Sequence, residues 1–130
     1  MKQELLSKLN TQILGRNVIY YENIDSTQLK AKEIKDIMKD GTIIITNNQT
    51  AGIGTHERTW YMGEGENIAF TLILKPQCNI AKISNITTLI AECMVDAIKK
   101  LYNKQLSIKL PNDLMCNGKK VGGILTRKYY

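Results

Sequence analysis

The chain has 130 residues, 43% hydrophobic and 23% charged side chains, and a formal net charge of +6. This length suits one domain with one core, and no segment approaches the roughly 18 consecutive apolar residues of a membrane span. The three cysteines form no C-x-x-C pair and the chain begins without a signal-peptide pattern. These features argue against a disulfide framework, a structural zinc site and a membrane location, and favour the cytoplasm.

The sequence of the first half of the chain predicts helices that alternate with strands. Apolar spacing predicts a helix over 3–14 that ends at Gly15, and β-branched and aromatic residues predict a strand over 17–24. A helix over 27–39 follows, with Asp25 or Ser26 as its N-cap, and then a buried strand over 42–47. The side chains expected to face the core from this helix are Leu29, Ile34, Ile37 and Met38.

The second half predicts a strand over 68–76, a helix over 84–102 capped by Ser84, and a short strand over 105–110. Asn117-Gly118 between two apolar runs predicts a β-hairpin. The apolar positions expected to make 84–102 a core helix are Ile86, Leu89, Ile90, Cys93, Met94, Ala97, Ile98 and Leu101. The fold class is therefore α+β, with a mixed, mostly antiparallel sheet and helices packed on one face.

Three segments carry polar residues where periodicity predicts none. They are IDSTQ at 24–28, NNQTAGIGTHERTW at 47–60 and KLPNDLMCNGKKVGGIL at 109–125. The second has Gly52 and Gly54 two residues apart, and glycine lets backbone N–H groups approach an anionic or polar ligand closely. A two-glycine loop after a strand is, taken alone, most often an ordinary turn.

Together and in this order, the three segments resemble the motifs of biotin–protein ligases: D-S-T-N/Q, Q-x-A-G-x-G-x-x-G-R-x-W, and K-W-P-N-D followed by a hairpin and K-x-x-G-I-L. The resemblance implies the fold that this family shares with class II aminoacyl-tRNA synthetases. It implies a ligase that uses biotin, ATP and Mg²⁺ to form biotinyl-5′-AMP, and then transfers biotin to a lysine of a biotin carboxyl carrier protein. Lipoate–protein ligases share the fold and are an alternative.

The resemblance also assigns roles to individual positions. The implied biotin-binding residues are Ser26, Thr27, Gln28, Gln49, Gly52, Trp60, Lys120 and Gly123. The implied ATP and adenylate loop consists of Gly52, Ile53, Gly54, Thr55, His56 and Arg58. The implied catalytic residues are Lys120, Asn112, Asp113 and Arg58, with Asp113 as the candidate Mg²⁺ ligand.

Several of these roles have a simpler alternative, and for Lys120 it is a solvated lysine of the hairpin. Ser26 could serve only as a helix cap, Arg58 as a solvated surface charge and Trp60 as a core residue. Asn112 and Asp113 could serve only in the turn after Pro111.

Several positions depart from the family pattern. Ile53 and Thr55 stand where well-known members carry arginines, and His56 occupies another usually basic position. Glu57 replaces a glycine, which is costly if the backbone there has a positive φ, and its carboxylate would lie near phosphates. Leu110 replaces the tryptophan of K-W-P-N-D.

By this resemblance, residues 1–130 look like the N-terminal two-thirds of the family's catalytic domain. The later strands, the C-terminal barrel domain and the DNA-binding domain of some members have no counterpart in it, so DNA binding is not expected, whereas a homodimer is compatible with the resemblance. A non-catalytic, biotin-binding or dimerising remnant of the family is the alternative of a different class. The scattered lysines make a nucleic-acid-binding module the weakest alternative.

Overall fold

The computed structural model describes residues 6–63, 66–78 and 85–129. The chain forms two compact units, Met1–Gln77 and Cys78–Tyr130, and each is described by itself. The expectation of a single domain over 1–130 stays a prediction.

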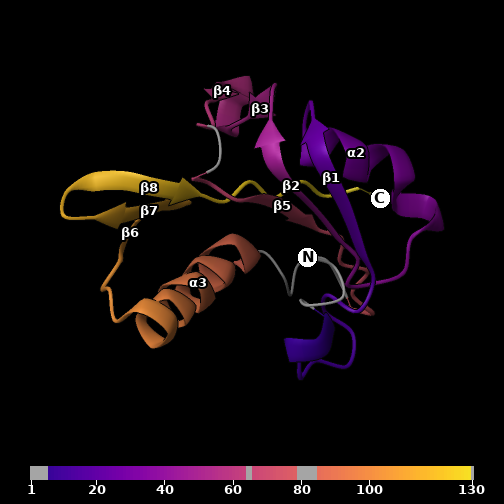
Figure 1. The fold of residues 1–130 in the computed structure, drawn as a ribbon, viewed down its shortest axis with the longest axis horizontal. Coiled ribbons are helices and arrows are strands. Elements are labelled where there is room, and N and C mark those ends of the chain that lie inside the picture. Colours follow the sequence, from indigo (N-terminus) through magenta and orange to yellow (C-terminus); the bar gives the residue numbers. More distant parts are fainter. Residues whose placement is uncertain (1–5, 64–65, 79–84, 130) are drawn as a thin grey trace. The chain divides into compact units, whose positions relative to one another are not determined.

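The first unit is built on a three-stranded sheet in the order β1-β2-β5 (Figure 1). Strand β1 (Val18–Ile24) runs parallel to β2 (Ile43–Gln49), and β2 runs antiparallel to β5 (Ala69–Leu72). The parallel pair needs a crossover, which is provided by helix α2 (Thr27–Ile34) and the 3₁₀ helix η1 (Lys35–Ile37). This mixed sheet confirms the predicted class.

The core of the first unit lies between α2 and this sheet. Its buried residues are Ala31, Ile44 and Ile73, and the partly buried residues packed against them are Ile19, Tyr21, Ile34 and Met38. Ile34 and Met38 therefore face the core as predicted. Leu29 and Ile37 do not, because they are 40% and 79% exposed. The α-helix changes to a 3₁₀ helix at Lys35, so the 3.6-residue period does not extend to Ile37.

The predicted helix over 3–14 is wrong over its second half. Of its described part, only residues 6–8 are helical. The Thr11 hydroxyl donates to the Leu14 carbonyl, a local bond that competes with helix formation. Gly15, with φ +72°, donates its N–H to the Gly41 carbonyl at 2.8 Å, which ties this segment to the connection before β2.

The loop after β2 forms a small hairpin of its own. Strands β3 (Gly52–Ile53) and β4 (Thr59–Trp60) are antiparallel and are joined through the 3₁₀ turn η2 (Thr55–Glu57). Gly52 pairs with Trp60. The segment predicted to be an open glycine loop is thus partly ordered by backbone pairing.

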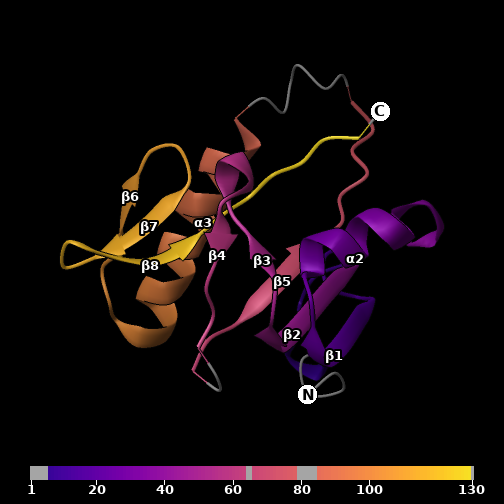
Figure 2. The same ribbon diagram turned by 90° about the horizontal axis from the view of Figure 1, so that it is seen from above.

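The second unit packs helix α3 (Ile86–Tyr102) on an antiparallel sheet, in which β6 (Ser107–Lys109), β7 (Asp113–Cys116) and β8 (Lys119–Gly123) lie in the order β6-β7-β8 (Figure 2). Its buried core residues are Ala91, Leu106 and Leu114, and the partly buried residues around them are Met94, Val95, Ile98, Ile108, Cys116 and Ile124.

The face of α3 that meets the sheet differs from the predicted one. Met94 and Ile98 pack as expected, but Leu89, Cys93 and Leu101 are exposed. The prediction that Cys93 is a core residue is therefore wrong. The predicted N-cap, Ser84, lies outside the described residues. No helix in the described ranges has the length and apolarity needed to cross a membrane.

The hairpin predicted at Asn117-Gly118 is confirmed. Both residues have positive φ, +52° and +77°, as a two-residue type I′ turn requires. Met115 pairs with Lys120, and Leu114 pairs with Gly122, so Val121 is an extra residue in a β-bulge.

Candidate active site

The first polar segment forms the N-terminus of α2. Ser26 is buried and is the N-cap, because its Oγ accepts a hydrogen bond from the Leu29 N–H at 3.3 Å. The Asp25 carboxylate in turn accepts the Ser26 N–H at 2.7 Å. Helix capping thus accounts for Ser26, and Asp25 binds the N–H of that capping residue. Capping does not account for Thr27.

Thr27 joins the first polar segment to the second. Its backbone N–H donates to Gln49 Oε1 at 2.9 Å, and its hydroxyl donates to the same oxygen at 3.3 Å. The orientation of the Gln49 amide follows from these bonds, because a backbone N–H can only donate. The residues at 24–28 and 47–60 that sequence reasoning singled out therefore meet in one place.

Backbone bonds fix the start of the loop against the same helix terminus. The Thr50 N–H donates to the Ile24 carbonyl at 2.9 Å, and the Ala51 N–H to the Asp25 carbonyl at 2.7 Å. Gly52 follows and is buried. A Cβ on Gly52 would lie 2.5 Å from Gln49 Nε2 and 2.7 Å from the Trp60 carbonyl oxygen. The close contacts of this glycine in the structure are with the Gln49 amide and β4, and the predicted approach to a ligand stays a prediction.

The tip of the hairpin carries the remaining loop positions. The Gly54 N–H donates to the Arg58 carbonyl at 2.6 Å, and the Arg58 N–H to the Thr55 carbonyl at 3.2 Å. Ile53, Gly54 and Thr55 are partly buried, whereas His56 and Arg58 are exposed. Arg58 is thus placed as an exposed cation, which fits both a phosphate contact and a solvated surface charge.

Two neighbouring residues at this tip adopt the left-handed conformation. His56 has φ +56° and Glu57 has φ +59°. Side chains with a Cβ disfavour this region by roughly 1–2 kcal/mol per residue, whereas glycine occupies it freely. The condition under which Glu57 would be costly is therefore met.

Replacing Glu57 by glycine is expected to raise the free energy of unfolding by about 1 kcal/mol, because it removes the left-handed strain. Chemical denaturation followed by Trp60 fluorescence measures this change. Glu57→Ala is the matched control, since it removes the carboxylate but keeps a Cβ. A Glu57→Gly variant no more stable than Glu57→Ala would show that the strain is not the reason.

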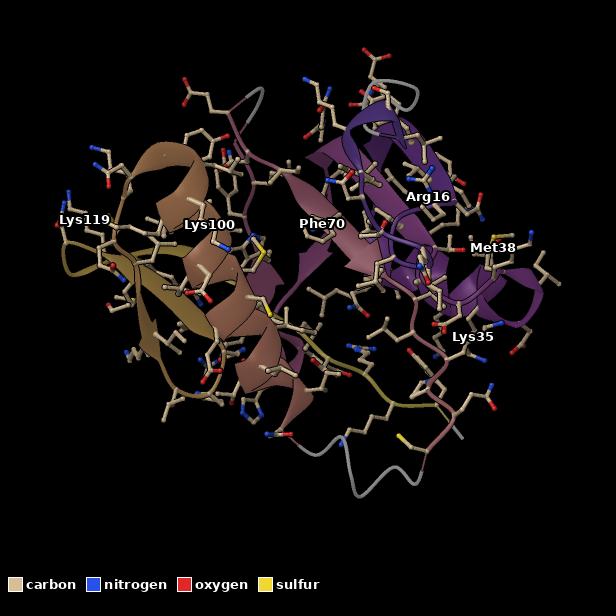
Figure 3. The ribbon with its side chains drawn as sticks, turned by 90° about the horizontal axis from the view of Figure 1, so that it is seen from below. Arg16, Lys35, Met38, Phe70, Lys100 and Lys119 are labelled. Carbon is tan, nitrogen blue, oxygen red and sulfur yellow. The ribbon has the colours of Figure 1, made fainter. Side chains whose placement is uncertain are left out.

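The third polar segment forms the β7–β8 hairpin of the second unit. Lys120 Nζ lies 2.9 Å from Asp113 Oδ1, and the two side chains are 44% and 21% exposed. The register explains this ion pair: Lys120 is opposite Met115, and Asp113 lies two residues before Met115 on the same face. The neighbouring Lys119 is exposed and its side chain extends away from the hairpin (Figure 3).

Asn112 closes the open end of this hairpin. Its Nδ2 donates to the Ile124 carbonyl at 3.2 Å, and its own carbonyl accepts the Ile124 N–H at 3.0 Å. Gly123 is paired with Asp113. Asn112 thus has a clear structural role, and its Oδ1 remains the atom that could contact a ligand.

Asp113 is the candidate ligand for a divalent metal ion. Within residues 6–63, 66–78 and 85–129, no three His, Cys, Asp or Glu side chains gather into a metal-binding group. Mg²⁺ is commonly held by one or two carboxylates together with substrate phosphates. The partly exposed Asp113 carboxylate fits this mode, and a cage made by the described side chains does not exist.

Thr71 on β5 is a residue of this network that sequence reasoning missed. Its hydroxyl donates to Thr27 Oγ1 at 2.8 Å, and its side chain is only 7% exposed. The sequence feature that could have indicated Thr71 is a hydroxyl residue within the apolar run IAFTLIL. The strand propensity of threonine explains its presence there just as well.

Comparisons with known proteins agree with the family resemblance of the three polar segments. Residues 20–130 match the model of the "Biotin/lipoate A/B protein ligase family". The bifunctional ligase/repressor BirA of Bacillus subtilis is 36% identical over 126 residues, which are 96% of this chain and 39% of that protein. A biotin–[acetyl-CoA-carboxylase] ligase of Paracoccus denitrificans is 34% identical over 103 residues, 78% of this chain and 42% of that protein.

Solved structures give the same result for the fold. A biotin protein ligase from Aquifex aeolicus in complex with biotin and ATP superposes with a TM-score of 0.69 at 30% identity, over 85% of this chain and 46% of that one. The biotin acetyl coenzyme A carboxylase synthetase of Helicobacter pylori superposes with a TM-score of 0.70 at 24% identity, over 87% and 55%. The chain thus spans about two fifths of the length of the Bacillus subtilis and Paracoccus denitrificans proteins. It belongs to the biotin/lipoate A/B protein ligase family.

Proposed function

We propose that this chain acts as the catalytic part of a biotin–protein ligase. The observation that carries the proposal is the Gln49 amide, held by Thr27 at the N-terminus of α2 and directly over Gly52. Polar groups fixed in this way present hydrogen-bonding atoms to a ligand at little entropic cost. The relatives named as biotin ligases support biotin as that ligand.

The proposed reaction has two steps. A biotin carboxylate oxygen attacks the α-phosphorus of ATP, the α–β phosphoanhydride bond breaks, and pyrophosphate leaves. The amine of an acceptor lysine then attacks the acyl carbon of biotinyl-5′-AMP, AMP leaves, and an amide bond forms. Neither step needs a covalent bond to the protein, so positioning and charge neutralisation are the functions of its side chains.

The proposal assigns roles to residues of all three polar segments. Thr27, Gln49 and Gly52 bind the biotin head, and Arg58 contacts phosphate as a cation. Lys120 neutralises the charge of the biotin carboxylate and the α-phosphate. Mg²⁺, when bound to Asp113 and the triphosphate, would supply further positive charge.

The test is a direct assay of both products. The purified chain is mixed with biotin, ATP-Mg and a biotin carboxyl carrier domain; pyrophosphate release and the mass of the acceptor are then measured. We expect both pyrophosphate and an acceptor heavier by one biotinyl group. A protein that is folded by circular dichroism but yields neither product would refute the proposal.

A biotin-binding role without catalysis is the second candidate, and Glu57 favours it. Glu57 places a carboxylate at the hairpin tip in a strained conformation. Calorimetry separates the two candidates, because a ligase should bind biotin more tightly when ATP is present. Competition between biotin and lipoate tests the remaining alternative, a lipoate–protein ligase.

A further inference from the structure

We infer that Thr71 is a positioning residue. Through the Thr27 hydroxyl it reinforces the orientation of the Gln49 amide that the Thr27 backbone N–H fixes, and so strengthens the preference of this amide for an acid whose head group carries a carbonyl acceptor. The inference rests on the proposed function for the identity of that acid, biotin. Its structural basis is the chain of hydrogen bonds from Thr71 to Thr27 to Gln49.

The direction of every bond in this chain follows from its far end. Gln49 Oε1 can only accept, so the Thr27 hydroxyl hydrogen points to it. The Thr27 hydroxyl has one hydrogen, so its oxygen must accept the hydrogen of Thr71. The Thr27 N–H adds a second donor to Gln49 Oε1. Both donor atoms of Thr27 are therefore used within the protein.

This arrangement leaves the Nε2 amine of Gln49 for a ligand. Within the described part of the chain, the amine makes no hydrogen bond, and it lies over Gly52 in a partly buried position. An amine group can only donate, so its partner must be an acceptor. The ureido carbonyl of biotin provides one, whereas the dithiolane ring of lipoate does not. A site built around a polar partner discriminates strongly against an analogue that lacks it.

The burial of Thr71 explains why it can hold this orientation. Thr71 is 93% buried and lies opposite Ile44 in the sheet, while its neighbour Phe70 on the other face of β5 is 42% exposed (Figure 3). A buried hydroxyl meets little water that could replace its partner, which favours the hydrogen bond from Thr71 to Thr27. Without that donor, the Thr27 hydroxyl could turn, and its bond to Gln49 would weaken.

The test compares Thr71→Val, which keeps the shape and removes the hydroxyl, with Thr71→Ser, which keeps the hydroxyl. Calorimetry measures the affinities for biotin, desthiobiotin and lipoate. We expect Thr71→Val to weaken the binding of both ureido ligands about tenfold and to leave lipoate binding unchanged. Thr71→Ser should restore the preference. Thr42→Val is the matched control: Thr42 is fully buried in the same unit, and its hydroxyl bonds to Lys39 and Asn17 instead.

A second readout does not depend on biotin. In nitrogen-15 NMR spectra of the unliganded protein, Thr71→Val should shift the Thr27 backbone amide and the Gln49 side-chain NH₂ signals, and Thr42→Val should not. Unchanged signals would overturn the inference, as would an unchanged ratio of biotin to lipoate affinity. If these signals shift but wild-type protein binds no biotin, the positioning role stands and the proposed function fails.

Discussion

Replacing Lys120 by methionine is expected to lower the rate of biotin-dependent pyrophosphate release at least about 100-fold, the usual cost of removing one preorganised group that stabilises developing charge. Methionine keeps most of the side-chain length and removes the cation. Lys120 is already held in place, since its Nζ lies 2.9 Å from Asp113 Oδ1 across the hairpin. The substitution therefore removes a positive charge that the hairpin already holds in a fixed position.

Lys119→Met provides the matched control for this prediction. Lys119 immediately precedes Lys120 in β8, so its side chain lies on the opposite face, and it is exposed. Its replacement should leave the rate within about twofold, as expected for a surface charge. Asp113→Asn controls for stability, because it also breaks the ion pair. The free energies of unfolding of Lys120→Met and Asp113→Asn should both lie within about 1 kcal/mol of the wild-type value, since the ion pair is partly exposed. A Lys120→Met protein that keeps its rate would contradict the assigned role.

Features that depend on local chemistry could be predicted from the sequence. The turn at Asn117-Gly118 requires two residues with positive φ, and Asn-Gly is the pair that adopts them most readily. Ser26 caps α2 because a short hydroxyl side chain can reach the free N–H groups of the first turn. The spacing of the three polar segments likewise indicated the family, which the match over residues 20–130 confirms.

Features that depend on tertiary packing could not be predicted. Helix α3 has more apolar positions than one face can bury, and periodicity does not say which of them meet the sheet. Val95 packs, whereas Cys93, two residues earlier, is exposed. The change to a 3₁₀ helix at Lys35 is a similar case. Thr71 shows the limit most clearly, because its role arises from a contact 44 residues away in the chain.

Gly52 is part of the sequence motif, and the structure explains why a larger residue would not fit there. Its backbone is not in the left-handed region, so an alanine there is opposed by contacts and not by φ. The added Cβ would lie 2.7 Å from the Trp60 carbonyl oxygen, a backbone atom that cannot turn away as a side chain would. It would also lie 2.5 Å from Gln49 Nε2, the amine that we propose binds biotin. One methyl group thus affects both the hairpin and the ligand.

We therefore expect Gly52→Ala to lower the free energy of unfolding by about 1–3 kcal/mol, the usual cost of overpacking, and to weaken biotin binding at least about 100-fold. Denaturant unfolding and calorimetry measure the two effects. Gly54→Ala is the control for stability, because a Cβ there would lie 3.4 Å from its nearest neighbour, the Arg58 carbonyl oxygen, which is ordinary contact. If biotin affinity fell in Gly52→Ala while stability did not, the displaced Gln49 amine alone would be responsible. If biotin affinity were unchanged, Gln49 would not be its partner, and both the site and the inference about Thr71 would fail together.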